Sequence, residues 1–132
     1  MRLLLDTHIW LWALLEPNRL GLRTATALKD AQTEKWLSPI SIWEFMVLTD
    51  KGRVKLPAME PEAWVARALN EFPIKEAPVT AEVVFAMRTV RLPHRDPADA
   101  FLAATAKTLD LTLVTADTRL LGVKGISILA NR

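Results

Sequence analysis

The sequence of 132 residues contains no cysteine. This absence excludes a disulfide-stapled fold, a thiol nucleophile and a metal site built from thiolates. Any metal ion must therefore be bound by oxygen or imidazole ligands. The length suits one compact domain whose core is stable without staples, so we expect residues 1–132 to form a single domain.

Long apolar runs are also missing. The closest candidate, MRLLLDTHIWLWALLEP, is interrupted by Asp6 and His8, which leaves residues 9–15 as its uninterrupted part. That stretch is too short to span a membrane and no small-residue cleavage site follows it, so we predict neither a membrane segment nor a signal peptide. We expect a soluble, cytoplasmic protein. The formal net charge of +2 is compatible with a polyanionic partner but identifies none.

Short apolar runs alternate with segments of helical length along the whole chain. Such alternation predicts βαβ units and therefore an α/β fold, a three-layer α/β/α sandwich around a mostly parallel, five-stranded sheet. The strand carboxyl ends then meet at one edge, where ligands bind. We expect strands within 2–6, 34–41, 74–79, 111–117 and 126–130, and helices within 7–17, 18–32, 41–52, 61–73, 80–93 and 97–106.

Acidic residues stand at several of these transitions, and each has a simple capping explanation. Asp6 could cap the helix that follows the first strand, and Asp117 could cap a short helix after LTLVTA. Ser41 and Glu44 fit a capping box, with Ser41 as the N-cap. Taken singly, these acids favour a structural role over a functional one.

The segment HRDPADAFLAATA contains two aspartates that we expect to do different work. Asp96 is a good N-cap before a proline at the first helical position. Asp99 instead heads the apolar stripe formed by Leu102, Ala103 and Ala106, which should face the sheet. A carboxylate that only interacts with solvent would point the other way, so Asp99 is the stronger candidate for a site.

Asp6, Glu44, Asp99 and Asp117 all fall where the topology brings chain segments to one edge. Carboxylates crowded there have raised pKa values unless a cation neutralises them. Oxygen ligands without cysteine favour Mg²⁺ or Mn²⁺, which can polarise a phosphodiester and activate water. The pattern therefore predicts metal-dependent phosphodiester hydrolysis. Hydroxyls such as those of Thr7, Ser41 and Thr115 could bind a carboxylate or a water molecule, or simply form caps and turns.

Four motifs in order, LLLDTHIWLW, SPISIWEF, HRDPADAFLAATA and LVTAD, resemble those of PIN-domain ribonucleases, most closely the VapC toxins of toxin–antitoxin pairs. The resemblance covers almost the whole chain. It implies a PIN-like fold in which Asp6, Glu44, Asp99 and Asp117 hold Mg²⁺ or Mn²⁺, with Asp96 as an accessory acid and Thr115 as a further accessory candidate.

The resemblance also implies cleavage of RNA, such as tRNA or rRNA, by water activated at the metal. It further implies a cognate antitoxin of the VapB type and a homodimer. One departure is visible: many relatives carry arginine directly after the aspartate equivalent to Asp99, whereas this chain has Ala100.

Several residues admit two interpretations. The segment Lys51–Lys55 and Arg88, Arg91 and Arg95 could bind RNA phosphates or form an ordinary solvated surface. His8 and His94 lie near the expected edge, where a histidine can bind metal or transfer protons, although a loop or capping role is the simpler prediction. For the whole chain the alternatives are a PIN nuclease that is not a toxin, and a binding module without catalysis.

Overall fold

The computed structural model describes residues 1–56 and 58–132, which form a five-stranded, fully parallel sheet in the order β3-β2-β1-β4-β5. The predicted α/β class and parallel five-stranded sheet are confirmed. The winding direction reverses between β1 and β4, which places the switch point of the sheet there. The strands are β1 (Arg2–Leu5), β2 (Glu34–Leu37), β3 (Lys75–Glu76), β4 (Thr112–Thr115) and β5 (Ser127–Ala130).

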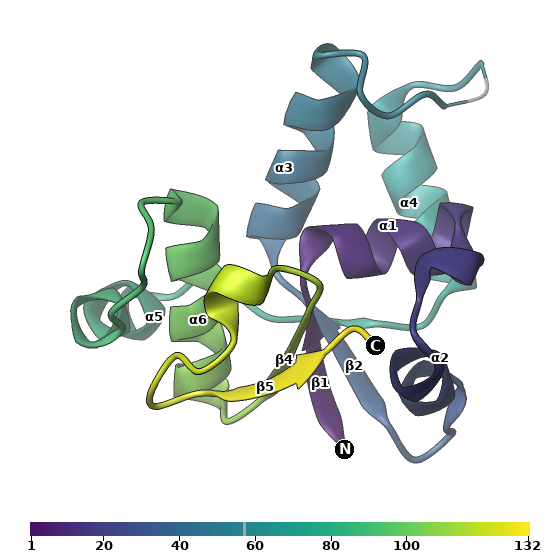
Figure 1. Cartoon of the computed structure of the whole chain (residues 1–132). Helices are drawn as coiled ribbons and strands as arrows, with labels where there is room; N and C mark the ends of the chain where they lie inside the picture. The colour runs from purple at the N-terminus through teal and green to yellow at the C-terminus, as the bar shows by residue number, and fades with distance from the viewer. Residues whose placement is uncertain (57) are drawn as a thin grey trace.

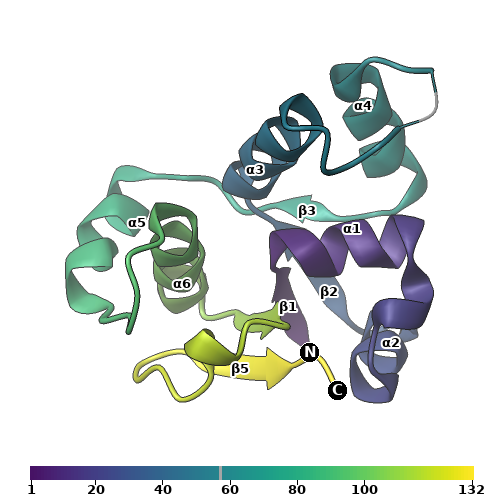
Figure 2. The ribbon, with the colours of Figure 1, turned by 45° about the horizontal axis from the view of Figure 1, so that its top comes forward.

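Helices cover both faces of this sheet (Figure 1). Figure 2 shows α5 and α6 together on one side, and α1, α2 and α4 on the other. The α-helices are α1 (Thr7–Leu15), α2 (Leu22–Lys29), α3 (Pro39–Asp50), α4 (Pro61–Glu71), α5 (Ala81–Ala86) and α6 (Pro97–Leu109). Three short 3-10 helices are η1 (Pro17–Arg19), η2 (Met87–Thr89) and η3 (Thr118–Leu120).

The core forms two layers because side chains alternate across each strand. In β1, Leu3 and Leu5 join a cluster that includes Trp10 of α1 and Phe45 of α3. Leu4 between them joins the opposite cluster with residues of α6. All three leucines are fully buried, so the continuous apolar run of β1 reflects a strand covered on both faces.

Two predicted boundaries were wrong. Helix α3 begins at Pro39, with the Ser38 hydroxyl accepting from the Ile40 amide at 3.0 Å, so Ser41 lies inside the helix and is not its N-cap. Ser38 is followed by proline at the first helical position and caps the free amides of the helix. The helix therefore begins three residues earlier than it would with Ser41 as its N-cap. Strand β3 is likewise limited to two residues.

The N-cap of helix α6 fixes where the helix begins and therefore where Asp99 lies. The Asp96 carboxylate accepts from the amides of Ala98 and Asp99, at 3.0 and 3.4 Å, as a capping aspartate should. The apolar stripe behaves as predicted, because Asp99 and Leu102 are both buried. Among the described residues, no helix is long and apolar enough to cross a bilayer.

The other end of α6 offers a test of backbone strain. Asp110 ends the helix in the left-handed conformation, with φ of 54°. Glycine adopts this conformation without steric cost, so Asp110→Gly should raise the free energy of unfolding by about 0.5–1 kcal/mol. Urea denaturation measures the change. The matched substitution Asp30→Gly, at an exposed residue with extended backbone, should lower stability or leave it unchanged; a loss at Asp110 would contradict the argument.

Candidate functional site

Five acidic side chains from four chain segments line one cavity of about 410 Å³ at the carboxyl edge of the sheet, beside the switch point. We call it the acidic cavity. It contains all four carboxylates predicted from the sequence, together with Asp96. Its lining residues are Asp6, His8, Trp12, Arg19, Glu44, Asp96, Asp99, Ala116, Asp117 and Arg119.

Asp6 lies directly after β1, and both of its carboxylate oxygens accept hydrogen bonds. One oxygen accepts from the Thr7 amide at 2.7 Å, and the other from the Thr115 hydroxyl at 2.6 Å. Thr115 ends β4, and its hydroxyl also accepts from the Asp117 amide at 3.0 Å. Only 8% of Asp6 is exposed, and burial raises its pKa despite these hydrogen bonds.

Glu44 reaches the cavity from the second turn of α3. Its carboxylate accepts a hydrogen bond of 2.5 Å from the Thr7 hydroxyl, which joins α3 to the start of α1. Partial burial raises the pKa of Glu44, and the nearby Asp6, Asp96 and Asp99 raise it further. The Ser41 hydroxyl is buried and has no partner among the described residues, so it makes no contact with a carboxylate.

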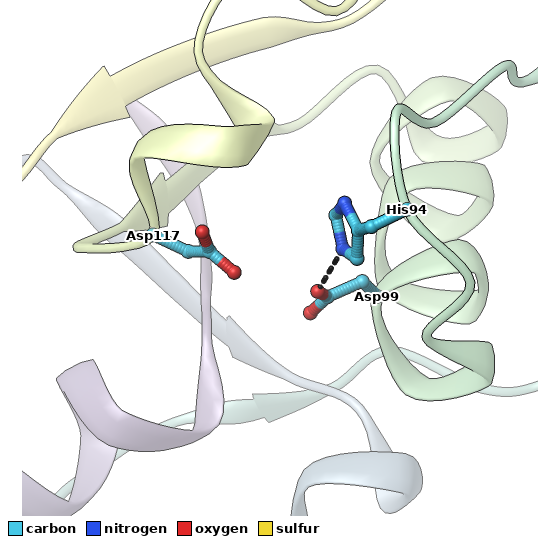
Figure 3. Close-up of side chains that lie close together, drawn as sticks. All are labelled: His94, Asp99 and Asp117. Carbon is cyan, nitrogen blue, oxygen red and sulfur yellow. Dashed lines mark hydrogen bonds and ion pairs between the residues drawn. The ribbon is translucent and has the colours of Figure 1, made fainter.

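Asp99 is bonded to His94, a contact that the sequence did not indicate. The His94 Nε2 lies 2.7 Å from the Asp99 carboxylate (Figure 3). The His94 Nδ1 is buried and has no partner within the described part of the chain. An unpartnered buried N–H is costly, so the tautomer that donates through Nε2 to Asp99 is favoured.

The pKa of Asp99 is raised to about 6, chiefly by burial. The hydrogen bond from His94 opposes this shift, while Asp96, Asp6 and Asp117 add to it by charge repulsion. Asp99 is 6% exposed. The folded protein therefore keeps a carboxylate at the site in an environment where its negative charge is poorly compensated.

Asp117 differs because a cation already compensates it. The Arg119 guanidinium donates to both carboxylate oxygens, with its shortest contact at 2.8 Å, and this pairing lowers the pKa of Asp117. Asp117 also caps η3 through the Arg119 amide. The same guanidinium lies 4.0 Å from the Asp99 carboxylate, so it partly offsets the charge of two acids at once.

His94, Asp99 and Asp117 form a group that could bind a metal ion, because one ligand atom from each lies within 4.8 Å of the others (Figure 3). This group differs from the predicted set by including His94. Asp6 and Glu44 line the same cavity but fall outside that close group. The cavity lining contains five carboxylates against two arginines, and the pKa values of Asp6, Glu44 and Asp99 are raised chiefly by burial and further by neighbouring carboxylates. A cation fits that donor set.

Sequence reasoning missed Arg119 and preferred a loop or capping role for His94. His94 lies in the loop before α6, as predicted, but its side chain contacts Asp99 rather than capping a helix. Arg119 was not singled out at all, although its position two residues after Asp117 suits a local ion pair. Thr115, in contrast, does donate to a carboxylate, as we considered possible from its position before Asp117.

Residues 3–126 match the family model described as "PIN domain". Ribonuclease VapC22 of Mycobacterium tuberculosis is 32% identical to this chain over 120 residues, which cover 89% of this chain and 88% of that protein. The family match extends over the segments that carry Asp6, Glu44, Asp99 and Asp117.

Solved structures share the fold at lower identity. VapBC2 from Rickettsia felis, bound to a DNA fragment from its promoter, matches with a TM-score of 0.72 and 17% identity over 98% of each chain. A toxin–antitoxin complex from Klebsiella pneumoniae matches with a TM-score of 0.66 and 21% identity, covering 98% of this chain and 97% of the other.

Proposed function

This chain belongs to the PIN-domain family, and from that premise we propose that it is a Mg²⁺- or Mn²⁺-dependent endoribonuclease of the VapC toxin type. One observation carries the proposal: five carboxylates from four chain segments line a single cavity, where burial raises the pKa values of Asp6, Glu44 and Asp99. Carboxylates crowded in this way favour a divalent cation and repel an anion.

Asp6, Glu44, Asp99 and Asp117 are the proposed metal-holding residues, with Asp96 as an accessory acid. When bound, Mg²⁺ or Mn²⁺ supplies a Lewis acid for the phosphodiester and lowers the pKa of water. The surrounding residues orient the carboxylates: Thr115 and the Thr7 amide fix Asp6, the Thr7 hydroxyl fixes Glu44, and His94 fixes Asp99. Partners of this kind set ligand orientation at metal sites.

We further propose that residues 1–132 act as one PIN domain in the cytoplasm, on RNA such as tRNA or rRNA. A cognate antitoxin of the VapB type would neutralise it. Support for the antitoxin comes from the structural relatives, since several of them are toxin–antitoxin complexes.

RNA cleavage in the presence and absence of divalent metal tests the proposal. The purified chain should cut tRNA or rRNA when Mg²⁺ or Mn²⁺ is supplied, lose that activity in a chelator, and regain it when metal is added back. Cleavage that persists in the chelator would overturn the metal mechanism. A complete lack of cleavage on all RNAs would instead favour a binding module.

Dimer formation is the remaining expectation, and the surface suggests where it occurs. Trp43 of α3 and Phe85 of α5 are 58% and 71% exposed, with Val84 beside Phe85, and both helices pack against α6. Large exposed apolar side chains favour protein–protein contacts. We propose that these helices form the homodimer contact.

Phe85→Glu should therefore weaken dimerisation about 100-fold, because it places an unpaired charge in an apolar contact. Sedimentation equilibrium would show monomer at concentrations where the wild type is dimeric. Leu22→Glu is the matched control, since Leu22 on α2 is 81% exposed and lies outside the proposed contact. A wild type that is monomeric throughout, or an unchanged dimer in Phe85→Glu, would contradict this assignment.

A further inference from the structure

Two basic cavities adjoin the acidic cavity, and each shares one arginine with it. The α1 cavity, of about 540 Å³, lies beside α1 and the segment after α3 and is lined by Trp12, Arg19, Arg53 and Lys55 among others. The η3 cavity, of about 500 Å³, is lined by Arg91, Arg119 and Lys124. Arg19 belongs to the acidic and α1 cavities, and Arg119 to the acidic and η3 cavities.

Arg19 is held in place from three directions. Its guanidinium lies over the Trp12 ring, 4.2 Å from the centroid, and 3.5 Å from the Glu16 carboxylate. Its backbone carbonyl accepts from the Asn131 side-chain amide at 3.0 Å, which ties η1 to the segment after β5. A cation held on an aromatic face in this way loses little side-chain entropy when it binds an anion.

The charged residues that line the η3 cavity are Arg91, Arg119 and Lys124, and of these Arg119 is paired with Asp117 of the acidic cavity. Lys107 of α6 adds a fourth cation at its margin, where the amine donates to the Thr89 hydroxyl at 2.8 Å. The α1 cavity has three cations and one acid, Glu16, which is paired with Arg19. Both cavities fall in the size range that binds ligand groups.

The acidic cavity by itself repels a polyanion, so RNA must be attracted on either side of it. Phosphate contacts from lysine and arginine supply most of the affinity for nucleic acids. Asp99 and Asp117 would hold a metal ion in place of their contacts with Arg119, whose guanidinium would then be available to a phosphate. The two basic cavities therefore provide cations next to the acidic cavity, where the phosphates on either side of the cleaved RNA bond would need them.

We propose that single-stranded RNA crosses the acidic cavity with one flank in the α1 cavity and the other in the η3 cavity. Arg19 and Arg119 bind the phosphates next to the cleaved one, and Arg53 with Lys55 and Arg91 with Lys124 bind the phosphates beyond them. This inference rests on the proposed ribonuclease function. For three of the basic residues noted in the sequence, Arg53, Lys55 and Arg91, it favours RNA binding over a role as ordinary solvated surface.

The salt dependence of RNA binding tests this path separately from catalysis. Affinity for a single-stranded RNA of about twelve nucleotides is measured over a range of salt concentrations, with every protein carrying Asp6→Asn to prevent cleavage. Each lost phosphate contact lowers the slope of log K against log salt by about 0.7. The pairs Arg53→Ala with Lys55→Ala, and Arg91→Ala with Lys124→Ala, should each lower it by about 1.4.

The matched control removes two positive charges from α2, at Arg23 and Lys29, which are exposed and line none of the three cavities. Its slope should equal that of the parent. Equal slopes in all proteins would overturn the path, and a lowered slope for one pair alone would overturn the claim that the strand spans both cavities. Because wild-type cleavage is measured separately, failure of the nuclease function and failure of the path give different results.

Discussion

Asp6→Asn and Asp99→Asn are each expected to slow metal-dependent RNA cleavage about 10³-fold or more. Both residues are buried in the wall of the acidic cavity, and asparagine removes the charge that holds a cation there. Stabilisation of the transition state by a metal ion is worth several kcal/mol, and each 1.36 kcal/mol changes a rate tenfold. Initial rates at saturating RNA, with the same Mg²⁺ or Mn²⁺ concentration throughout, measure the effect.

The substitution preserves shape, so the loss should not arise from unfolding. An asparagine at position 6 can still accept from the Thr7 amide through its oxygen, and its amide nitrogen can donate to the Thr115 hydroxyl oxygen in place of the bond that the aspartate accepts there at 2.6 Å. Asp30→Asn is the matched control: Asp30 is exposed and precedes β2, at the opposite edge of the sheet from the cavity. Equal cleavage by the wild type and both cavity variants would contradict the proposed mechanism.

Thr115 should give a smaller effect on the same assay, because it acts through Asp6. Thr115→Val removes the hydroxyl that donates to the Asp6 carboxylate, and loss of such an orienting partner lowers activity or metal affinity about 10–100-fold. Thr115→Ser keeps the donor and should retain most of the activity. If Val and Ser variants were equally impaired, packing of the threonine methyl group would be the cause instead of carboxylate orientation.

Asp99→Asn is also expected to stabilise the metal-free fold, by about 1–3 kcal/mol at pH 7. The reason is that the pKa of Asp99 is raised to about 6 in the folded protein, against 3.8 for an ordinary aspartate. The unfolded chain therefore releases the proton at lower pH than the folded chain does. As pH rises from about 4 to 6, ionisation of Asp99 removes stability from the wild type, and the loss is complete above that range.

Chemical denaturation of wild type and Asp99→Asn in a chelator, at several pH values, measures this difference. The two proteins should be similar near pH 4, and the advantage of the variant should grow up to about pH 6 and then level off. Comparing the pair cancels the other titrating groups. A variant that is less stable than wild type at pH 7 would show that the Asp99 charge is well compensated in the fold.

Added metal should reverse the order of stability of wild type and Asp99→Asn. Binding to the folded state stabilises a protein by about 2.7 kcal/mol when the free metal is at 100 times its dissociation constant. Wild type should gain this stability with Mg²⁺ or Mn²⁺, whereas Asp99→Asn should gain little. Since metal must compete with a proton for Asp99, the gain should shrink below about pH 6.

The sequence alone was sufficient for the parallel α/β fold and for the four acids of the site. Both depend on local features: apolar runs such as the one in β1 have strand length, and Asp6, Glu44, Asp99 and Asp117 stand next to strand ends or in the first two turns of helices. In a parallel sheet, that placement brings them to one edge whatever the remaining details of packing. The orientation of Asp99 followed equally from its place in the buried stripe of α6.

The tertiary structure decided which groups surround those acids. The Thr7–Glu44, Thr115–Asp6 and His94–Asp99 contacts depend on the position of one chain segment against another, which a single sequence does not specify. Local periodicity therefore determined where the carboxylates lie, while long-range packing determined their partners, their pKa values and the basic cavities on either side.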